Sequence, residues 1–66
     1  MIEAQWRWCA KWLRQAISEA RGGTPARARE MSDMLHRLEE GGVDLPYEIE
    51  QLWFKLTCAL EGEGRG

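Results

Sequence analysis

Apolar residues recur along the chain at alternating spacings of three and four, the pattern of helices that each bury one face. In the first segment this apolar face comprises Ile2, Trp6, Cys9, Leu13, Ala16 and Ala20. The second segment has Ala28, Met31, Leu35 and Leu38, flanked by Met34. The third has Leu45, Ile49, Leu52, Leu56 and Ala59, widened by Trp53 and Leu60. No segment alternates with period two, so the pattern predicts an all-α protein.

Glycine and proline divide this pattern into three predicted helices, at about residues 2–21, 25–40 and 45–61. They form a single helical domain, residues 1–61, followed by a glycine-rich tail, residues 62–66, that we expect to be disordered. Two arrangements fit these lengths. One is a compact three-helix unit, and the other is a long helical hairpin in which the middle helix is a connecting arm.

Each predicted turn carries its own stop and start signals. Two consecutive glycines end the first helix, and the second helix is expected to start with Thr24 as N-cap and Pro25 at the first helical position. A second pair of glycines ends the second helix, and Asp44 is the expected N-cap of the third.

A chain of 66 residues is short for so much apolar helix surface. At this size only about 60% of the unfolded chain's surface is buried on folding, so stability is marginal without a disulfide, a bound metal or an oligomer. Two cysteines and one histidine are too few for a four-ligand zinc site. We therefore expect a second copy of the chain to complete the bundle as a homodimer.

The cysteines and the first residues bear on the compartment. The chain opens without a basic leader followed by an apolar run, and no apolar stretch approaches the roughly 20 residues of a membrane span. We expect a cytoplasmic protein with Cys9 and Cys58 as reduced thiols. A disulfide between them is the alternative.

Candidate chemistry along the chain is sparse. Asp33, His36 and Glu40 share one face of the second predicted helix and could hold a metal ion, but a solvated polar face is the favoured interpretation. No serine lies beside a base in a nucleophile pattern, and the paired glycines are helix stops without the pattern of a phosphate-binding loop. We expect no enzyme activity, no metal and no cofactor.

Charge divides the chain into two halves. Residues 1–29 carry a net charge of +4 and residues 30–66 a net charge of −6. Such a division favours contact between the two halves, within one chain or between chains. It also gives the protein an acidic face to offer to a partner.

Tryptophans on the first helix lie beside its apolar face rather than on it, since Trp8 and Trp12 fall about 40–80° beyond its edge. They either widen the core of one chain or form a dimer interface, or they meet another protein. The expected core and dimer residues are Trp6, Trp8, Trp12, Leu13, Leu52, Trp53 and Leu56. Basic residues interleaved with these tryptophans also resemble a surface for stacking nucleic-acid bases, formed by Arg7, Lys11 and Arg14.

A second set of aromatic residues lies opposite the apolar face of the third helix. Tyr47, Phe54 and Cys58 share this side, and Glu50 and Glu61 flank them. Three alternatives are open for these residues: burial within one chain, self-association, or docking of another protein. Rigid aromatic rings ringed by charge are typical of interface hot spots, so we expect a partner with a basic rim.

Two resemblances bear on function. Residues 37–48, Arg-Leu-Glu-Glu-Gly-Gly-Val-Asp-Leu-Pro-Tyr-Glu, resemble the helical hairpin of the small, noncatalytic subunit of bacterial exodeoxyribonuclease seven, although the tryptophan-rich first helix departs from that family. In size, composition and architecture the chain is similar to the short helical proteins with which phages inhibit host regulators, such as quorum-sensing anti-activators and anti-CRISPR proteins. The second resemblance has no residue motif, so it assigns no functional residue.

The combined expectation is a non-enzymatic, homodimeric adaptor or inhibitor. It would bind and occlude a regulatory protein of a bacterial host, such as a transcription factor, through Tyr47, Glu50, Phe54, Cys58 and Glu61. The alternatives are an accessory subunit of an enzyme complex, as the exodeoxyribonuclease resemblance implies, and direct binding of nucleic acid through the first helix.

Overall fold

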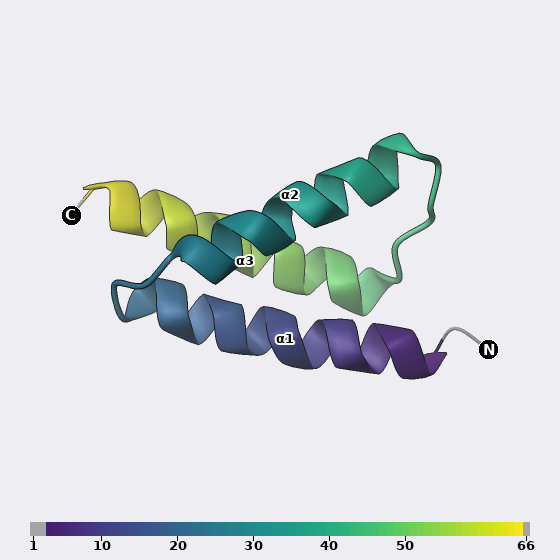
Figure 1. The fold of residues 1–66 in the computed structure, drawn as a ribbon, viewed down its shortest axis with the longest axis horizontal. Coiled ribbons are helices and arrows are strands. Elements are labelled where there is room, and N and C mark those ends of the chain that lie inside the picture. Colours follow the sequence, from purple (N-terminus) through teal and green to yellow (C-terminus); the bar gives the residue numbers. More distant parts are fainter. Residues whose placement is uncertain (1–2, 66) are drawn as a thin grey trace.

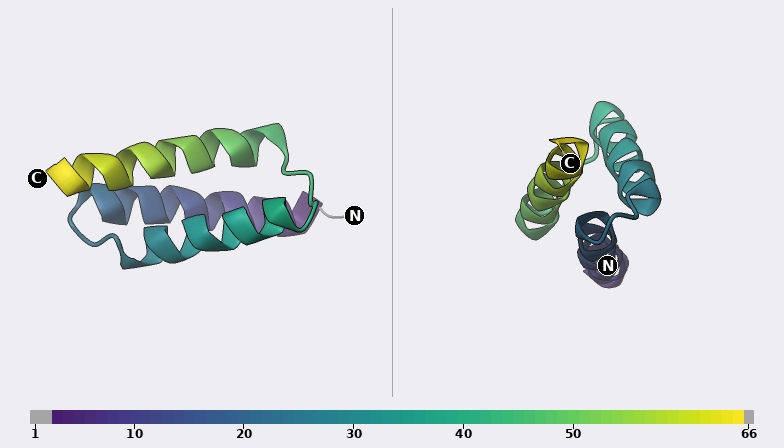
Figure 2. Two further views of the ribbon diagram at one scale, coloured as in Figure 1. Left: turned by 90° about the horizontal axis from the view of Figure 1, so that it is seen from above. Right: turned by 90° about the vertical axis from the view of Figure 1, so that its left-hand side faces the viewer.

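The computed structural model describes the backbone of residues 3–65 and the side chains of residues 4–62. They form three α-helices, α1 (Glu3–Arg21), α2 (Ala26–Glu40) and α3 (Tyr47–Arg65). Helices α1 and α3 run parallel to each other, and α2 runs antiparallel to both (Figures 1 and 2). Every pair of helices is in contact, most extensively α1 with α3. The all-α prediction is confirmed, and the arrangement is the three-helix unit rather than the extended hairpin.

The core lies along the centre of the bundle, where all three helices contribute residues. Leu13, Leu35, Ile49 and Leu56 are completely buried or nearly so. The other buried side chains are Ala10, Ala16, Ile17, Ala20, Ala28 and Leu52. Burying a leucine or isoleucine contributes about 1.5–3 kcal/mol relative to leaving it exposed, so these four residues, with Ile17 and Leu52, dominate the apolar driving force.

The buried arc of α1 is wider than its sequence pattern predicted. Ala10 and Ile17 are buried although they lie beside the predicted apolar face. The reason is that α1 packs against both other helices, whereas the pattern describes packing against one. Ile2, at the start of the predicted face, lies outside the described residues.

The two turns close in the same way. After α1, the amide of Gly23 donates to the carbonyl of Ala20 at 3.1 Å, and the amide of Thr24 donates to the carbonyl of Glu19 at 2.8 Å. After α2, the amides of Gly42 and Val43 make the corresponding bonds. This is the Schellman motif, which needs a left-handed residue after the helix end. Gly23 and Gly42 fill that position with φ of +96° and +90°.

The starts of the second and third helices differ from the predictions. Pro25, not Thr24, is the N-cap of α2, and no side-chain hydrogen bond caps that helix. Helix α3 begins at Tyr47, two residues later than expected, and the carbonyl of Pro46 accepts from the amide of Glu50. In the first turn the Schellman bond of the Thr24 amide holds Thr24 in the turn. In the second, Asp44 lies two residues before Pro46, whose carbonyl accepts the bond from Glu50, so neither polar residue is placed to cap its helix.

The end of α3 also differs from the prediction. The helix continues to Arg65, so residues 62–65, which the sequence placed in a disordered tail, are helical. Glycine at positions 62 and 64 costs about 1 kcal/mol each relative to alanine but does not prevent a helix.

Gly23→Ala is expected to lower the free energy of unfolding by about 1 kcal/mol, because alanine is strained at positive φ. Gly22→Ala is the matched control. Gly22 lacks positive φ, and an added Cβ would meet only the carbonyls of Ser18 and Glu19 at 3.5 and 3.6 Å. Urea denaturation followed by circular dichroism measures both, and equal effects of the two substitutions would contradict the turn geometry.

Among the residues whose side chains are described, one exposed ion pair joins the basic and acidic halves of the chain. Nη2 of Arg14 on α1 lies 2.7 Å from Oε2 of Glu48 on α3. Both side chains are more than half exposed, so this pair contributes at most about 1 kcal/mol. The predicted contact between the two halves is thus made within one chain. No helix of the described residues is long and apolar enough to cross a membrane.

Candidate protein-binding surfaces

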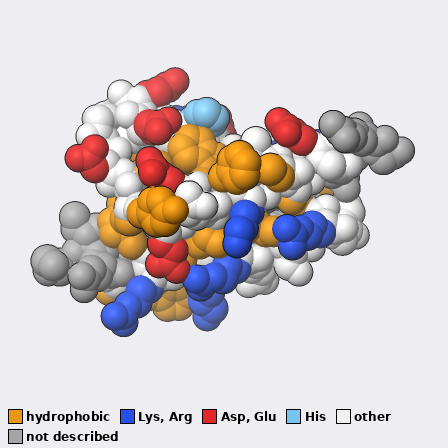
Figure 3. Space-filling view, turned by 180° about the vertical axis from the view of Figure 1, so that it is seen from behind, with side chains coloured by type: hydrophobic (Ala, Val, Ile, Leu, Met, Phe, Trp, Pro, Cys, Tyr) orange, Lys and Arg blue, Asp and Glu red, His pale blue; other side chains and the backbone are white. Residues whose placement is uncertain are grey.

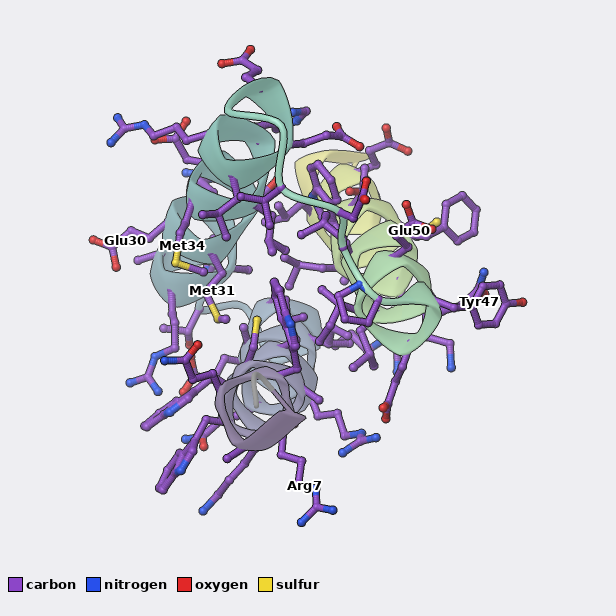
Figure 4. All side chains as sticks on the ribbon, turned by 90° about the vertical axis from the view of Figure 1, so that its right-hand side faces the viewer. Arg7, Glu30, Met31, Met34, Tyr47 and Glu50 are labelled. Carbon is purple, nitrogen blue, oxygen red and sulfur yellow. The ribbon has the colours of Figure 1, made fainter. Side chains whose placement is uncertain are left out.

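The acidic-aromatic residues of the third helix lie on its outer side. We call Tyr47, Glu50, Phe54, Cys58 and Glu61 the α3 stripe. Tyr47 is 76% exposed and Phe54 is 67% exposed, the two highest values among the large apolar side chains described. In Figure 4, Tyr47 and Glu50 extend away from the bundle. The single chain therefore does not bury these aromatic rings.

The surroundings of the α3 stripe are charged. Glu50, Cys58 and Glu61 are exposed like the aromatic residues. Figure 3 shows this face of the molecule, where apolar side chains gather between acidic groups on one side and basic groups on the other. The surface therefore combines aromatic rings with exposed carboxylates.

The predicted core and dimer residues divide between interior and surface. Leu13, Leu52 and Leu56 are buried in the single chain, and Trp6 and Trp53 are half-buried against the core. Trp8 and Trp12, by contrast, are 58% and 39% exposed. The wider core that would have absorbed them within one chain does not form.

Cations cover the faces of both exposed tryptophans. The Nζ atom of Lys11 lies 5.0 Å from the ring centroid of Trp8, and the guanidinium of Arg27 lies 4.9 Å from that of Trp12. Arg27 also approaches Glu19 at 3.5 Å. Such contacts are worth about 0.5–1 kcal/mol each at exposed sites and hold the rings in place.

The candidate nucleic-acid residues share the outer side of α1, but they are not all free. Lys11 covers Trp8, and Arg14 is paired with Glu48. Arg7, Trp8 and Lys11 line a shallow depression with Ala4. Lys11 thus occupies one face of the Trp8 ring, the surface on which a nucleic-acid base would stack.

An apolar groove between α1 and α2 was not predicted from the sequence. Two connected hollows, of about 470 and 380 Å³, share Gln5, Cys9 and Met34 in their walls. The remaining wall residues are Trp6, Trp12, Arg27, Met31, Leu38 and Val43. We call this surface the α1/α2 groove. Arg27 is the one charged residue in its walls, and Met34 and Val43 are 42% and 40% exposed.

A signal for the groove exists in the sequence. Arg27, Met31, Met34 and Leu38 recur at helical spacing on one side of α2, next to the buried line through Ala28 and Leu35. Methionine suits such a surface because its flexible thioether adapts to different apolar partners.

The candidate metal residues of α2 are not brought together with other ligands. Among the described residues, no three His, Cys, Asp or Glu side chains lie close enough to hold a metal ion. His36 instead contacts Trp53 edge to face, with ring centroids 4.7 Å apart. Nε1 of Trp53 donates to Oγ of Ser32 at 3.2 Å. Ser32 and His36 thus tie α2 to α3, a packing role that the sequence reasoning missed.

Both cysteines are free thiols that lie on different surfaces. Cys9 lines the α1/α2 groove and is half-buried, whereas Cys58 is exposed on the α3 stripe. Burial raises the pKa of the Cys9 thiol. At neutral pH the fraction of Cys9 present as the reactive thiolate is therefore smaller than for an unburied cysteine.

Cys58 is accordingly expected to react with a maleimide several-fold faster than Cys9 at pH 7. Raising the pH toward 9 should narrow the ratio of the two labelling rates, since the thiolate fraction of Cys9 then increases. Time-resolved mass spectrometry of the labelled peptides measures both rates, with Cys9→Ser and Cys58→Ser as assignment controls. Faster labelling of Cys9 would contradict its burial in the groove.

No protein-family model, curated protein or solved structure matches the chain.

Proposed function

We propose that this chain is a non-enzymatic protein-binding module, a homodimeric adaptor or inhibitor that docks a regulatory protein through the α3 stripe. The observation that carries the proposal is the exposure of Tyr47 and Phe54 on one side of α3, beside Glu50 and Glu61. A regulator with a basic surface, such as a transcription factor, suits this chemistry. Occupying that surface would keep the regulator's own ligand away.

The energetics of such a contact are favourable. Tyr47 and Phe54 together expose on the order of 250 Å² of aromatic surface, whose burial is worth about 6 kcal/mol before the costs of association. The carboxylates of Glu50 and Glu61 at the edge would guide a basic partner and raise its association rate. Binding should therefore weaken as salt is added, mainly through slower association.

The test begins with affinity capture from the cells that naturally produce the chain, followed by quantitative mass spectrometry. The wild-type chain and the control variant Gln15→Ala/Ser18→Ala, whose changes are exposed on α1, are expected to enrich the same basic protein. Tyr47→Ala/Phe54→Ala should lose it at least 30-fold, because truncating a hot-spot side chain costs 2 kcal/mol or more. Circular dichroism checks that all three chains remain helical.

Two outcomes would overturn the proposal. One is unchanged capture by the double alanine variant. The other is salt-sensitive binding of single-stranded DNA that Arg7→Glu and Lys11→Glu abolish, which would assign the function to α1.

A further inference from the structure

The molecule carries one convex and one concave apolar surface, and they lie on opposite sides. In Figure 4, Tyr47 and Glu50 of α3 extend to one side, while Met31 and Met34 of α2 lie on the other. The convex surface is the α3 stripe, a single helix face. The concave surface is the α1/α2 groove, which runs between two helices and is open along its length. A helix laid in a groove is a common way for an amphipathic helix to bind.

The charges along the edges of these two surfaces are complementary. Arg27 stands in the groove wall, and Lys11, held against Trp8, lies beyond Trp12 on the α1 side. On the α2 side, Glu30 lies near Met34 (Figure 4). The α3 stripe has the opposite signs, since helix geometry places Glu50 and Glu61 along one edge and Lys55 along the other.

The area available sets the strength of the contact. The stripe offers on the order of 250 Å² of aromatic surface, and Trp12, Met34 and Val43 of the groove are each about 40% exposed. A stable dimer usually buries about 800 Å² on each partner. Such a contact belongs with the weak and reversible interfaces. This suits the α3 stripe, which must be released from self-association before it can bind the external partner.

We propose that the α1/α2 groove binds the α3 stripe of a second copy of this chain. The inference rests on the self-association in the proposed function and names the two surfaces that make it. Because stripe and groove lie on opposite sides, the contact is head to tail. In a dimer one copy keeps its stripe free and the other keeps its groove free, and further copies can add at these two ends as the concentration rises. The free stripe can bind the external partner, which competes with further self-association.

Blocking the two surfaces separately tests the pairing. Phe54→Glu places a charge in the stripe and Met34→Glu places one in the groove; both positions are exposed, so the fold should persist. In sedimentation velocity from 1 to 500 μM, the wild-type mass is expected to rise with concentration and each variant alone to remain monomeric. An equimolar mixture of the two variants should form a heterodimer and nothing larger. Ser18→Glu, on the outer side of α1, should behave as wild type.

The other outcomes overturn the inference. Continued self-association of Phe54→Glu alone would show that groove pairs with groove, and continued self-association of Met34→Glu alone would show that stripe pairs with stripe. A wild-type chain that is monomeric throughout the concentration range, or a mixture that stays monomeric, excludes the contact. Circular dichroism and the Tm of each variant confirm that a negative result does not come from unfolding.

The two cysteines provide an independent readout, since one lies on each surface. A short bismaleimide applied at high concentration is expected to yield species of dimer mass in which Cys9 of one copy is linked to Cys58 of another. The Cys9→Ser and Cys58→Ser chains should each fail to cross-link alone and should cross-link when mixed. Links between two Cys9 or two Cys58 residues as the main product contradict the head-to-tail arrangement.

The same variants separate this inference from the proposed function. Met34→Glu should lose self-association but keep the external partner, whose site is on α3. Self-association that survives Met34→Glu, with partner capture intact, rejects the inference and leaves the proposed function standing. Loss of partner capture in Tyr47→Ala/Phe54→Ala alone says nothing about the groove, which is judged by the mixing experiment.

Discussion

Leu13→Ala is expected to remove about half of the free energy of unfolding of this chain. Leu13 is completely buried on the helix that contacts both others, so the substitution leaves a cavity that the neighbouring helices cannot all close. Such truncations cost about 2–5 kcal/mol. A 66-residue domain has a total stability of only about 3–10 kcal/mol.

Urea denaturation followed by circular dichroism at 222 nm measures this loss. Leu13→Met is the matched control, because it nearly conserves volume and should cost less than about 1.5 kcal/mol. Gln15→Ala, two residues away on an exposed site, should change stability by less than about 0.5 kcal/mol. Similar midpoints for Leu13→Ala and Leu13→Met would place Leu13 outside the core.

Trp53→Ala is expected to cost about 2–4 kcal/mol and to loosen α2 from α3. These two helices share the smallest contact in the bundle, and Trp53 supplies both a hydrogen bond to Ser32 and an edge-to-face contact with His36. Its side chain is half-buried, so the expected cost is toward the lower part of the range for buried tryptophan. Hydrogen exchange should show faster opening of α2 than of α1.

Two conservative variants separate the contributions of Trp53. Trp53→Phe keeps a ring for His36 but removes the indole donor, which should cost about 1 kcal/mol beyond the lost packing area. Ser32→Ala removes only the acceptor and should cost less than Trp53→Phe. An alanine variant no less stable than the phenylalanine variant would show that the ring contributes nothing to the α2–α3 contact.

The helices themselves could be predicted because their signals are local. Leu13, Leu35 and Leu56 repeat at the helical period, and the paired glycines stop two helices where the structure places left-handed residues. The helix starts were harder to predict. Thr24 and Asp44 are good N-cap residues by type, but each of these helices begins only after the proline that follows, and the Thr24 amide is already bonded in the preceding turn.

The exposed surfaces were harder to predict, because they depend on how the helices pack together and the pattern of a single helix does not show this. The sequence placed Tyr47 and Phe54 opposite the core, and the structure leaves both exposed. The groove could not be found this way, because it exists only where Cys9 of α1 and Met34 of α2 face the same space. A periodic line on a single helix cannot distinguish the wall of a groove from the edge of a core.

The parallel course of α1 and α3 has a mechanical consequence. The start of α1 and the end of α3 lie at opposite ends of the bundle (Figure 1). Tension applied between these ends pulls the two helices along their axes in opposite directions, against the most extensive helix contact in the molecule. Such a load must slide the interlocked leucines past one another together instead of peeling them apart singly. The bundle should therefore resist stretching better than its small size suggests.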